Sequence, residues 1–184
     1  MISELDPEKV IVIDESGCYL NMILPYARAN GGERISMPVP FIKGTKISLI
    51  GAVSPHGVEA ALYGQWNANG EIFLTFLKEQ LIPKLTSENI IIMDNIQFHK
   101  LQTVINIIEA TGAKIMFLPP YSPDFSPIEN MWGKIKQILK KLAPRSMKAF
   151  NQAISKAFLE IKETDLLGWF KYCGFHIEPD RKPL

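Results

Sequence analysis

Two short apolar runs, each followed by an aspartate, constrain this chain more than any other feature of its sequence. The first is Val10–Ile13, followed by Asp14, and the second is Asn89–Met93, followed by Asp94. Short, nearly continuous apolar runs are typical of strands that are buried on both faces of a sheet. Ligand sites in such sheets form beyond the strand ends, and a buried strand does not normally end in an unpaired charge. The pattern therefore predicts a functional edge marked by Asp14 and Asp94.

The rest of the chain predicts an α/β fold with a mixed sheet. Further strands are expected at 18–24, 46–53, 58–63 and 113–118, and helices at 71–85, 101–110, 128–142 and 146–161. The strands at 46–53 and 58–63 are joined by a Pro-His-Gly turn, which predicts an antiparallel hairpin. The later strands alternate with helices, which predicts parallel crossover connections. Helices are expected to flank a sheet that is antiparallel on one side and parallel on the other.

Composition limits the classes of protein to which the chain can belong. Its 184 residues suit one domain. The 20 basic and 19 acidic side chains leave a net charge of +1, so any contact with nucleic acid has to come from a local patch or from another part of the protein. Cys18 and Cys173 have neither zinc-site nor disulfide-framework spacing, which fits a reducing compartment. No segment has the pattern of a signal peptide or the length of a membrane span, so no membrane partner is expected.

A third carboxylate, Glu129, lies in the first turn of a predicted helix, after a loop stiffened by prolines. Carboxylates on rigid elements suit Mg²⁺, which prefers hard oxygen ligands. Two such ions roughly 3.5–4 Å apart can drive an in-line phosphoryl displacement without a side-chain nucleophile. Taken singly, the aspartates could be turn residues, and the glutamate could only complement the helix dipole. Together they suggest a metal-dependent phosphoryl-transfer enzyme.

Three sequence motifs carry a resemblance to a known family. They are Val12-Ile13-Asp14-Glu15-Ser16, then Met93-Asp94-Asn95 with His99, and Leu118-Pro119-Pro120-Tyr121-Ser122-Pro123-Asp124 running into Pro127-Ile128-Glu129-Asn130. The chain resembles the DDE transposases of the mariner-like superfamily, in particular their bacterial insertion-sequence branch. The 34 residues between Asp94 and Glu129 also resemble the family's usual separation. Phe125-Ser126 replaces the more usual Leu-Asn, a mild departure that leaves the three acidic positions intact.

The resemblance implies a ribonuclease-H-like catalytic domain that spans residues 1–184. By motif position, Asp14, Asp94 and Glu129 match the family's catalytic triad and would hold two Mg²⁺ or Mn²⁺ ions. The implied activity is metal-dependent cleavage of DNA followed by strand transfer, with transposon ends and target DNA as partners. A ribonuclease-H-like nuclease without strand transfer, or a non-catalytic remnant that only binds DNA, remains an alternative.

The family also implies partners that this sequence does not contain. Its members carry N-terminal helix-turn-helix modules, whereas here the first predicted strand begins about ten residues from Met1. A separate DNA-binding chain or a missing N-terminal region is therefore expected to recognise the transposon ends. The resemblance further implies a homodimer when active and a cytoplasmic, nucleoid-associated location in a bacterium.

Several neighbours of the three carboxylates have two possible roles. Asn95 could orient Asp94 or contact a phosphate, or it could cap a turn. His99 could position water or phosphate, or it could be a local structural histidine. Glu15 should point to the opposite face of the strand from Asp14 and act as a structural hydrogen-bond acceptor. Trp132 could stack on a DNA base, although packing in the core is the stronger expectation.

The segment after Glu129 is basic, with no acidic residue from Asn130 to Leu159. The predicted DNA-contacting residues there are Lys134, Lys136, Lys140, Lys141 and Arg145. If the segment continues as a helix, Lys134, Lys141 and Lys148 fall near one stripe. Such a patch would deliver the DNA backbone to the carboxylates, and the alternative is a solvated helix face.

Overall fold

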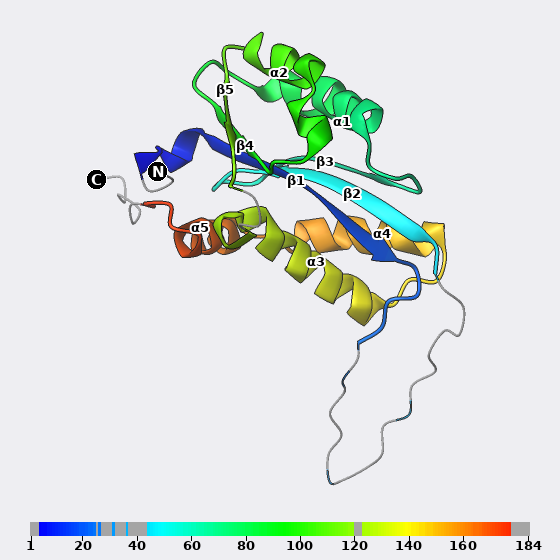
Figure 1. Cartoon of the computed structure of the whole chain (residues 1–184). Helices are drawn as coiled ribbons and strands as arrows, with labels where there is room; N and C mark the ends of the chain where they lie inside the picture. Colours follow the sequence, from blue (N-terminus) through cyan, green and yellow to red (C-terminus); the bar gives the residue numbers. More distant parts are fainter. Residues whose placement is uncertain are drawn as a thin grey trace.

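A five-stranded mixed sheet lies between two layers of helices (Figure 1). The computed structural model describes residues 4–24, 26, 31, 36, 44–119 and 123–177. The strands are β1 (Val10–Tyr19), β2 (Lys46–Val53), β3 (Val58–Gly64), β4 (Ile90–Met93) and β5 (Lys114–Phe117), and their order is β3-β2-β1-β4-β5. β1, β2 and β3 pair antiparallel, whereas β1, β4 and β5 pair parallel. This confirms the mixed sheet expected from the sequence.

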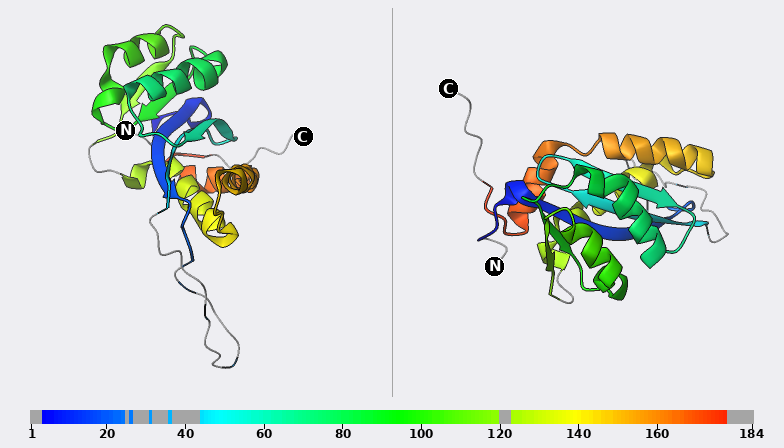
Figure 2. Two further views of the ribbon diagram at one scale, coloured as in Figure 1. Left: turned by 90° about the vertical axis from the view of Figure 1, so that its right-hand side faces the viewer. Right: turned by 90° about the horizontal axis from the view of Figure 1, so that it is seen from above.

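The helices divide between the two faces of the sheet, as the views in Figure 2 also show. One face is covered by α1 (Gly70–Phe76) and α2 (Gln102–Glu109), and the other by α3 (Pro127–Leu142), α4 (Met147–Leu159) and α5 (Glu163–Tyr172). Short helical turns lie elsewhere along the chain, at η2 (Pro7–Lys9), η3 (Leu77–Leu81), η4 (Ile82–Lys84), η5 (Gln97–Lys100) and η6 (Pro123–Phe125). No helix in the described part of the chain is both long enough and apolar enough to cross a membrane.

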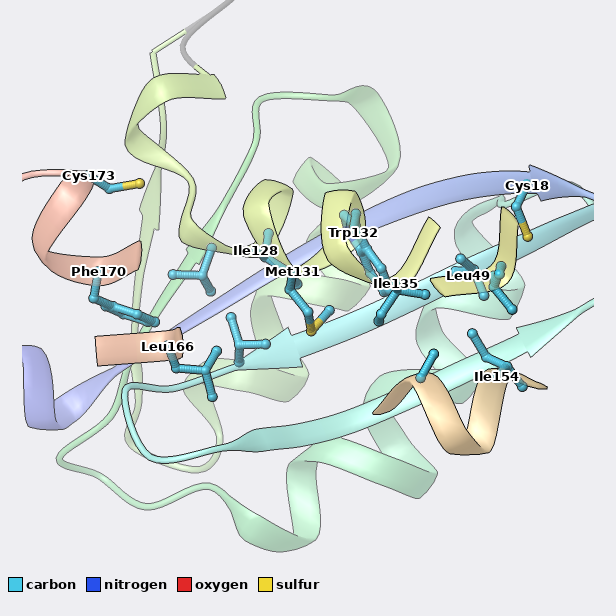
Figure 3. Packing of buried hydrophobic residues seen from close by; sticks show 14 of the residues in the cluster. Cys18, Leu49, Ile128, Met131, Trp132, Ile135, Ile154, Leu166, Phe170 and Cys173 are labelled. Atoms are coloured by element: carbon cyan, nitrogen blue, oxygen red, sulfur yellow. The ribbon is translucent and has the colours of Figure 1, made fainter. Parts of the chain in front are cut away.

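The apolar run of β1 is explained by burial on both sides. Val10 and Val12 belong to the core beneath α3, α4 and α5, part of which Figure 3 shows, whereas Ile11 and Ile13 belong to the core beneath α1 and α2. All four are 5% exposed or less. Because alternate side chains of a strand face opposite ways, a strand between two cores has to be apolar at every position. The same alternation continues to Asp14, which faces the α3 side.

β1 is longer than the sequence suggested. Asp14 does not end the strand, because β2 pairs with β1 from Val12 to Tyr19. β4, in contrast, pairs only with Val10–Val12. The separate strand predicted at 18–24 is therefore wrong: Cys18 and Tyr19 are the end of β1, and a turn follows. Both cysteines are buried and free.

The predicted helix at 71–85 is regular only in its first half. It continues from α1 as one π-helical turn, η3, and then as the 3-10 turn η4. Pro83 lies in η4 and has no backbone N–H with which to extend an α-helix. α5 was not predicted, and its N-terminus is held by the backbone N–H of Lys162, which donates to Asp165 Oδ2 at 2.9 Å. This local hydrogen bond and the burial of Leu166 and Phe170 account for the helix.

α2, α3 and α4 begin and end within two residues of the ranges 101–110, 128–142 and 146–161 expected from the sequence. Pro127 is at the first position of α3, where its missing N–H has no consequence. The Ser146 side chain caps α4 by accepting a hydrogen bond from the Ala149 N–H at 3.2 Å. Gly112, just after α2, has a φ of 85°, which favours glycine. These ends fix where α3 begins, and therefore where Glu129 lies.

Candidate active site

The parallel pairing of β1 and β4 brings two of the predicted carboxylates together. Val12 of β1 lies opposite Ile92 of β4. Continuing this register by two residues puts Asp94, just after β4, beside Asp14. β1 runs on past this point with only β2 as a hydrogen-bonded neighbour. The candidate functional edge therefore lies where β4 ends, and Asp14 lies there in the middle of its strand.

Asp14 is a largely desolvated carboxyl group with other carboxylates around it. Burial raises its pKa to about 8, and the negative charges of Glu129, Glu15 and Asp94 act in the same direction. A backbone hydrogen bond from Glu15 opposes the shift only in part. The Trp132 indole donates from Nε1 to Asp14 Oδ2 over 3.2 Å. Among the described residues, Asp14 therefore has neutral hydrogen-bond donors and no cationic partner.

Asp94 has a very different partner, the buried ring of His99. Nδ1 of His99 lies 2.8 Å from Asp94 Oδ1, and Nε2 lies 2.9 Å from Glu15 Oε1. Burial alone would lower the pKa of His99, but the hydrogen bonds and charges of Asp94 and Glu15 outweigh it and raise the pKa to about 9. For Asp94, partial burial acts to raise the pKa, and the hydrogen bond and charge of His99 overcome it, so the pKa is lowered.

His99 connects the sheet to the layer of α1 and α2. Its ring is fully buried, with its centroid 4.4 Å from that of Phe73 and 4.8 Å from that of Phe98. Glu15 points to this side of β1, opposite to Asp14, as the alternation of the strand predicts. The geometry agrees with a structural acceptor role for Glu15. It gives His99 two carboxylate partners, one of which is Asp94.

Glu129 is exposed in the first turn of α3. Of the negative charges that raise the pKa of Asp14, that of Glu129 has the largest effect, ahead of Glu15 and Asp94. The buried residues of α3, which include Ile128, Met131, Trp132 and Ile135, fasten the helix to the sheet. The three predicted carboxylates, on β1, after β4 and at the start of α3, are therefore close enough for the charges of Asp94 and Glu129 to act on Asp14.

The three carboxylates do not form a closed coordination shell as they lie. Within residues 4–24, 26, 31, 36, 44–119 and 123–177, no group of three or more His, Cys, Asp or Glu side chains is arranged to hold a metal ion. The donor chemistry nevertheless fits a hard divalent cation, since carboxylate oxygens are the ligands that Mg²⁺ prefers. A cation between Asp14, Asp94 and Glu129 would also offset the repulsion that raises the pKa of Asp14.

The predicted DNA-contacting residues separate into two groups. Lys134 makes an ion pair with Asp165 of α5, with 2.5 Å between Nζ and Oδ2. Arg145 donates to the backbone carbonyl oxygens of Leu20 and Met22, at 2.9 and 3.1 Å. These two side chains hold parts of the fold together, whereas Lys136, Lys140 and Lys141 make no ion pair with the described residues.

The proposed stripe through Lys134, Lys141 and Lys148 is wrong. α3 ends at Leu142, and Ala143 follows with a φ of 45° in the left-handed region. Lys148 belongs to α4, which is a separate helix.

Asn95 is half-buried directly after Asp94. Of the proline-rich motif, residues 120–122 lie outside the described part of the chain.

Two contacts of the site were not foreseen from the sequence. One is the hydrogen bond from Trp132 to Asp14, since Trp132 was expected only to pack in the core or to stack on DNA. The other is the bridge from Glu15 through His99 to Asp94. Both join residues that are distant in sequence, so no local pattern could have revealed them. The one hint in the sequence is the spacing of three residues between Glu129 and Trp132, which puts both on one side of the same helix.

Comparison with known proteins agrees with this geometry. The model of the DDE superfamily endonuclease family matches residues 9–151, a range that includes Asp14, Asp94 and Glu129. No curated protein sequence matches significantly.

Solved structures of the Mos1 transposase share the fold. Its paired-end complex with the left transposon end aligns with a TM-score of 0.73 at 15% identity, over 91% of this chain and 52% of that one. The catalytic domain of the Mos1 mariner transposase aligns with a TM-score of 0.69 at 14% identity, over 91% of this chain and 78% of that one. The chain spans about half the length of the transposase in the paired-end complex.

The five-stranded mixed sheet with helices on both faces thus has the ribonuclease-H-like fold that it shares with the Mos1 transposase catalytic domain. The family match covers most of the sequence and all three candidate carboxylates. The chain belongs to the DDE superfamily endonucleases.

Proposed function

We propose that this domain catalyses DNA transposition, cleaving phosphodiester bonds and joining DNA strands with Mg²⁺ or Mn²⁺ held by Asp14, Asp94 and Glu129. The observation that carries the proposal is the carboxyl group of Asp14. It is desolvated, and the charges of Glu129 and Asp94 from two other elements reach it. A structural role would not need the charges of Glu129 and Asp94 close to a third, poorly solvated carboxyl group.

The chemistry needs no side-chain nucleophile. Two bound divalent cations would activate the attacking oxygen and stabilise the leaving oxygen of an in-line displacement. The protein holds Asp14 and Asp94 on adjacent strands, and the docking of α3 sets the position of Glu129. In cleavage, a water oxygen forms a new bond to phosphorus while one P–O bond of the backbone breaks. In joining, a DNA 3′-hydroxyl takes the place of water.

Three lysines of α3 that make no ion pair with the described residues suit the path of the DNA backbone. Lys136 and Lys140 follow Glu129 by seven and eleven residues, which places all three along one side of the helix. Lys141 is exposed beside them. Phosphates that contact these lysines would lie along the helix that presents Glu129. Lys134 and Arg145 contribute less, because their side chains are already paired within the fold.

The finer assignments are part of the same proposal. The substrates are transposon ends and target DNA, because the Mos1 complexes contain a transposon end. A separate chain or an N-terminal region recognises the end sequences, and the active form is a homodimer. The motifs around Asp94 and Glu129 favour the bacterial insertion-sequence branch and, with it, a cytoplasmic, nucleoid-associated protein.

Product analysis tests the reaction. Supercoiled plasmid and a labelled duplex with a free 3′-hydroxyl are incubated with the domain in Mn²⁺, in Mg²⁺ or in EDTA. Metal-dependent nicking together with transfer of the label to the plasmid is expected. Nicking alone would indicate a ribonuclease-H-like nuclease without strand transfer, and DNA binding with neither product would indicate a non-catalytic remnant. Asp94→Asn should abolish both products, whereas Asn95→Asp, which keeps the carboxylates, should impair them far less.

A salt titration of DNA binding tests the lysine path. Each phosphate contact contributes about 0.9 to the slope of log K against log salt, so Lys140→Glu with Lys141→Glu should lower the slope by about 2. The matched control reverses two exposed lysines of α4, Lys148 and Lys156, in the same way. Equal effects of the two pairs would show that binding reflects overall charge and would refute the assignment to α3.

A further inference from the structure

The side chain of Trp132 fills a gap that the sheet leaves beside Asp14. Gly51 of β2 is the cross-strand partner of Asp14. A Cβ atom at Gly51 would lie 2.7 Å from Cη2 of Trp132 and 2.9 Å from Cζ2, closer than packing allows. The six-membered ring of the indole therefore lies against β2 only because residue 51 is glycine. Figure 3 shows Trp132 directed from α3 toward the strands, beside Met131 and Ile135.

This placement directs the polar atom of the indole at the carboxyl group. While Cη2 and Cζ2 lie over Gly51, Nε1 lies 3.2 Å from Oδ2 of Asp14. Trp132 is 1% exposed, and a buried indole N–H needs an acceptor. Packing alone would be satisfied by any large apolar ring, so the orientation of the N–H toward Asp14 calls for a further reason.

The identity of the donor suits a carboxylate that has to bind a cation. A lysine or arginine at this position would neutralise Asp14 and compete with a metal ion. A neutral N–H orients one carboxylate oxygen, and both the charge and the second oxygen stay available. Trp132 also follows Glu129 by three residues on α3, so the same hydrogen bond sets the helix that carries the third carboxylate against the strand that carries the first.

We infer that Trp132 is a positioning residue for the metal site, which orients Asp14 through its indole N–H and holds Glu129 opposite it, and that Gly51 is the gap this requires. The inference rests on the proposed function, since it assigns Trp132 a role toward the metal that Asp14 would bind. It predicts that removing the N–H weakens metal binding even when the packing is kept.

The test measures Mn²⁺ binding to the metal-free domain from the electron paramagnetic resonance signal of free Mn²⁺, without DNA or turnover. The decisive variant carries benzothiophene in place of the indole at position 132, which keeps the bicyclic shape and puts sulfur where the N–H was. Loss of groups that orient metal ligands weakens binding by about 10- to 100-fold, and a weakening in this range is expected. Gly51→Ala, which displaces the indole from the opposite side, should weaken binding similarly. Trp169→Phe in α5, half-buried in the same layer, is the control and should bind Mn²⁺ like the wild type.

The outcomes separate the inference from the function on which it rests. Wild-type affinity in a folded domain that carries the benzothiophene side chain would overturn the role of Trp132. Asp14→Asn tests the metal site itself and should abolish tight Mn²⁺ binding. If Asp14→Asn binds Mn²⁺ like the wild type, or if the wild type does not bind it at all, the proposed function fails and the inference fails with it. If Asp14→Asn loses binding and the benzothiophene variant keeps it, only the positioning role is refuted.

Discussion

Asp14 and Asp94 are neighbours in the sheet register, yet their surroundings have opposite effects on them. Asp14 faces the α3 layer, where burial and the charges of Glu129, Glu15 and Asp94 raise its pKa to about 8. Asp94 faces His99, whose hydrogen bond and charge hold the pKa of that carboxyl group below its ordinary value. One carboxyl group therefore keeps its proton at neutral pH without a cation, and the other is ionised.

The difference bears on how the proposed metal site would bind a cation. At neutral pH His99 supplies a counter-charge to Asp94 from the α1 and α2 side, so this proposed ligand is a carboxylate there. Asp14 has neutral donors, the Trp132 indole and the backbone N–H of Glu15, so its negative charge would become stable when a cation replaces the proton. Metal binding to the site should accordingly release a proton and become tighter as the pH approaches 8.

The largest expected effect that separates the two aspartates is the pH dependence of stability. The pKa of Asp14 is raised in the folded state from 3.8 to about 8, so the folded state binds more protons than the unfolded state between these values. The free energy of unfolding of the metal-free domain should fall as the pH rises from about 4 to 8, by on the order of 5 kcal/mol from this group.

Urea unfolding at several pH values in EDTA measures this fall in stability. Asp14→Asn should flatten the curve and be more stable than the wild type at pH 8. An unchanged slope would show that Asp14 is not the titrating group.

A second, smaller effect tests the partner of Asp94. The pKa of His99 is raised in the folded state from 6.5 to about 9. Its contribution to stability should be fully present below pH 6.5 and should be lost as the pH rises through 9, on the order of 3 kcal/mol in all. His99→Gln keeps a polar side chain of similar size and should remove this decline. Parallel curves for the wild type and His99→Gln between pH 6.5 and 9 would show that His99 does not make this contribution to stability.

The smallest effect is a difference of sign between the two asparagine variants. Asp94→Asn removes one of the two carboxylate partners of His99 and should lower the free energy of unfolding at pH 7 by about 1 kcal/mol, since Asp94 is 44% exposed and solvent screens part of the interaction. Asp14→Asn should raise it. Sequence reasoning alone predicts that Asp94→Asn leaves stability unchanged or higher, because it treats all three carboxylates as mutually repelling. Melting of both variants in EDTA decides between the two, and a gain in stability for Asp94→Asn would refute the role given to His99.

The three carboxylates and the sheet were predictable because their signals are local. Val10–Ile13 and Ile90–Met93 are apolar because both faces of their strands are buried, and Pro127 marks the start of α3. The length of β1 was not predictable, because it depends on pairing with β2 across a long connection. The contact of Trp132 with Asp14 and the contact of Glu15 with His99 depend on how a helix and a turn dock on opposite faces of β1. They set the hydrogen-bonded surroundings of the two aspartates, which sequence spacing cannot supply.

The most direct test of the account is the position of the metal itself. Crystals of the domain grown at a saturating concentration of Mn²⁺ give an anomalous difference map that locates the ion without reference to activity. The account predicts a peak within coordination distance of the carboxylate oxygens of both Asp14 and Asp94, on the side of Glu129, with the Trp132 indole still donating to Asp14. A well-ordered site with no peak between these carboxylates, or Mn²⁺ bound only elsewhere on the domain, would contradict it.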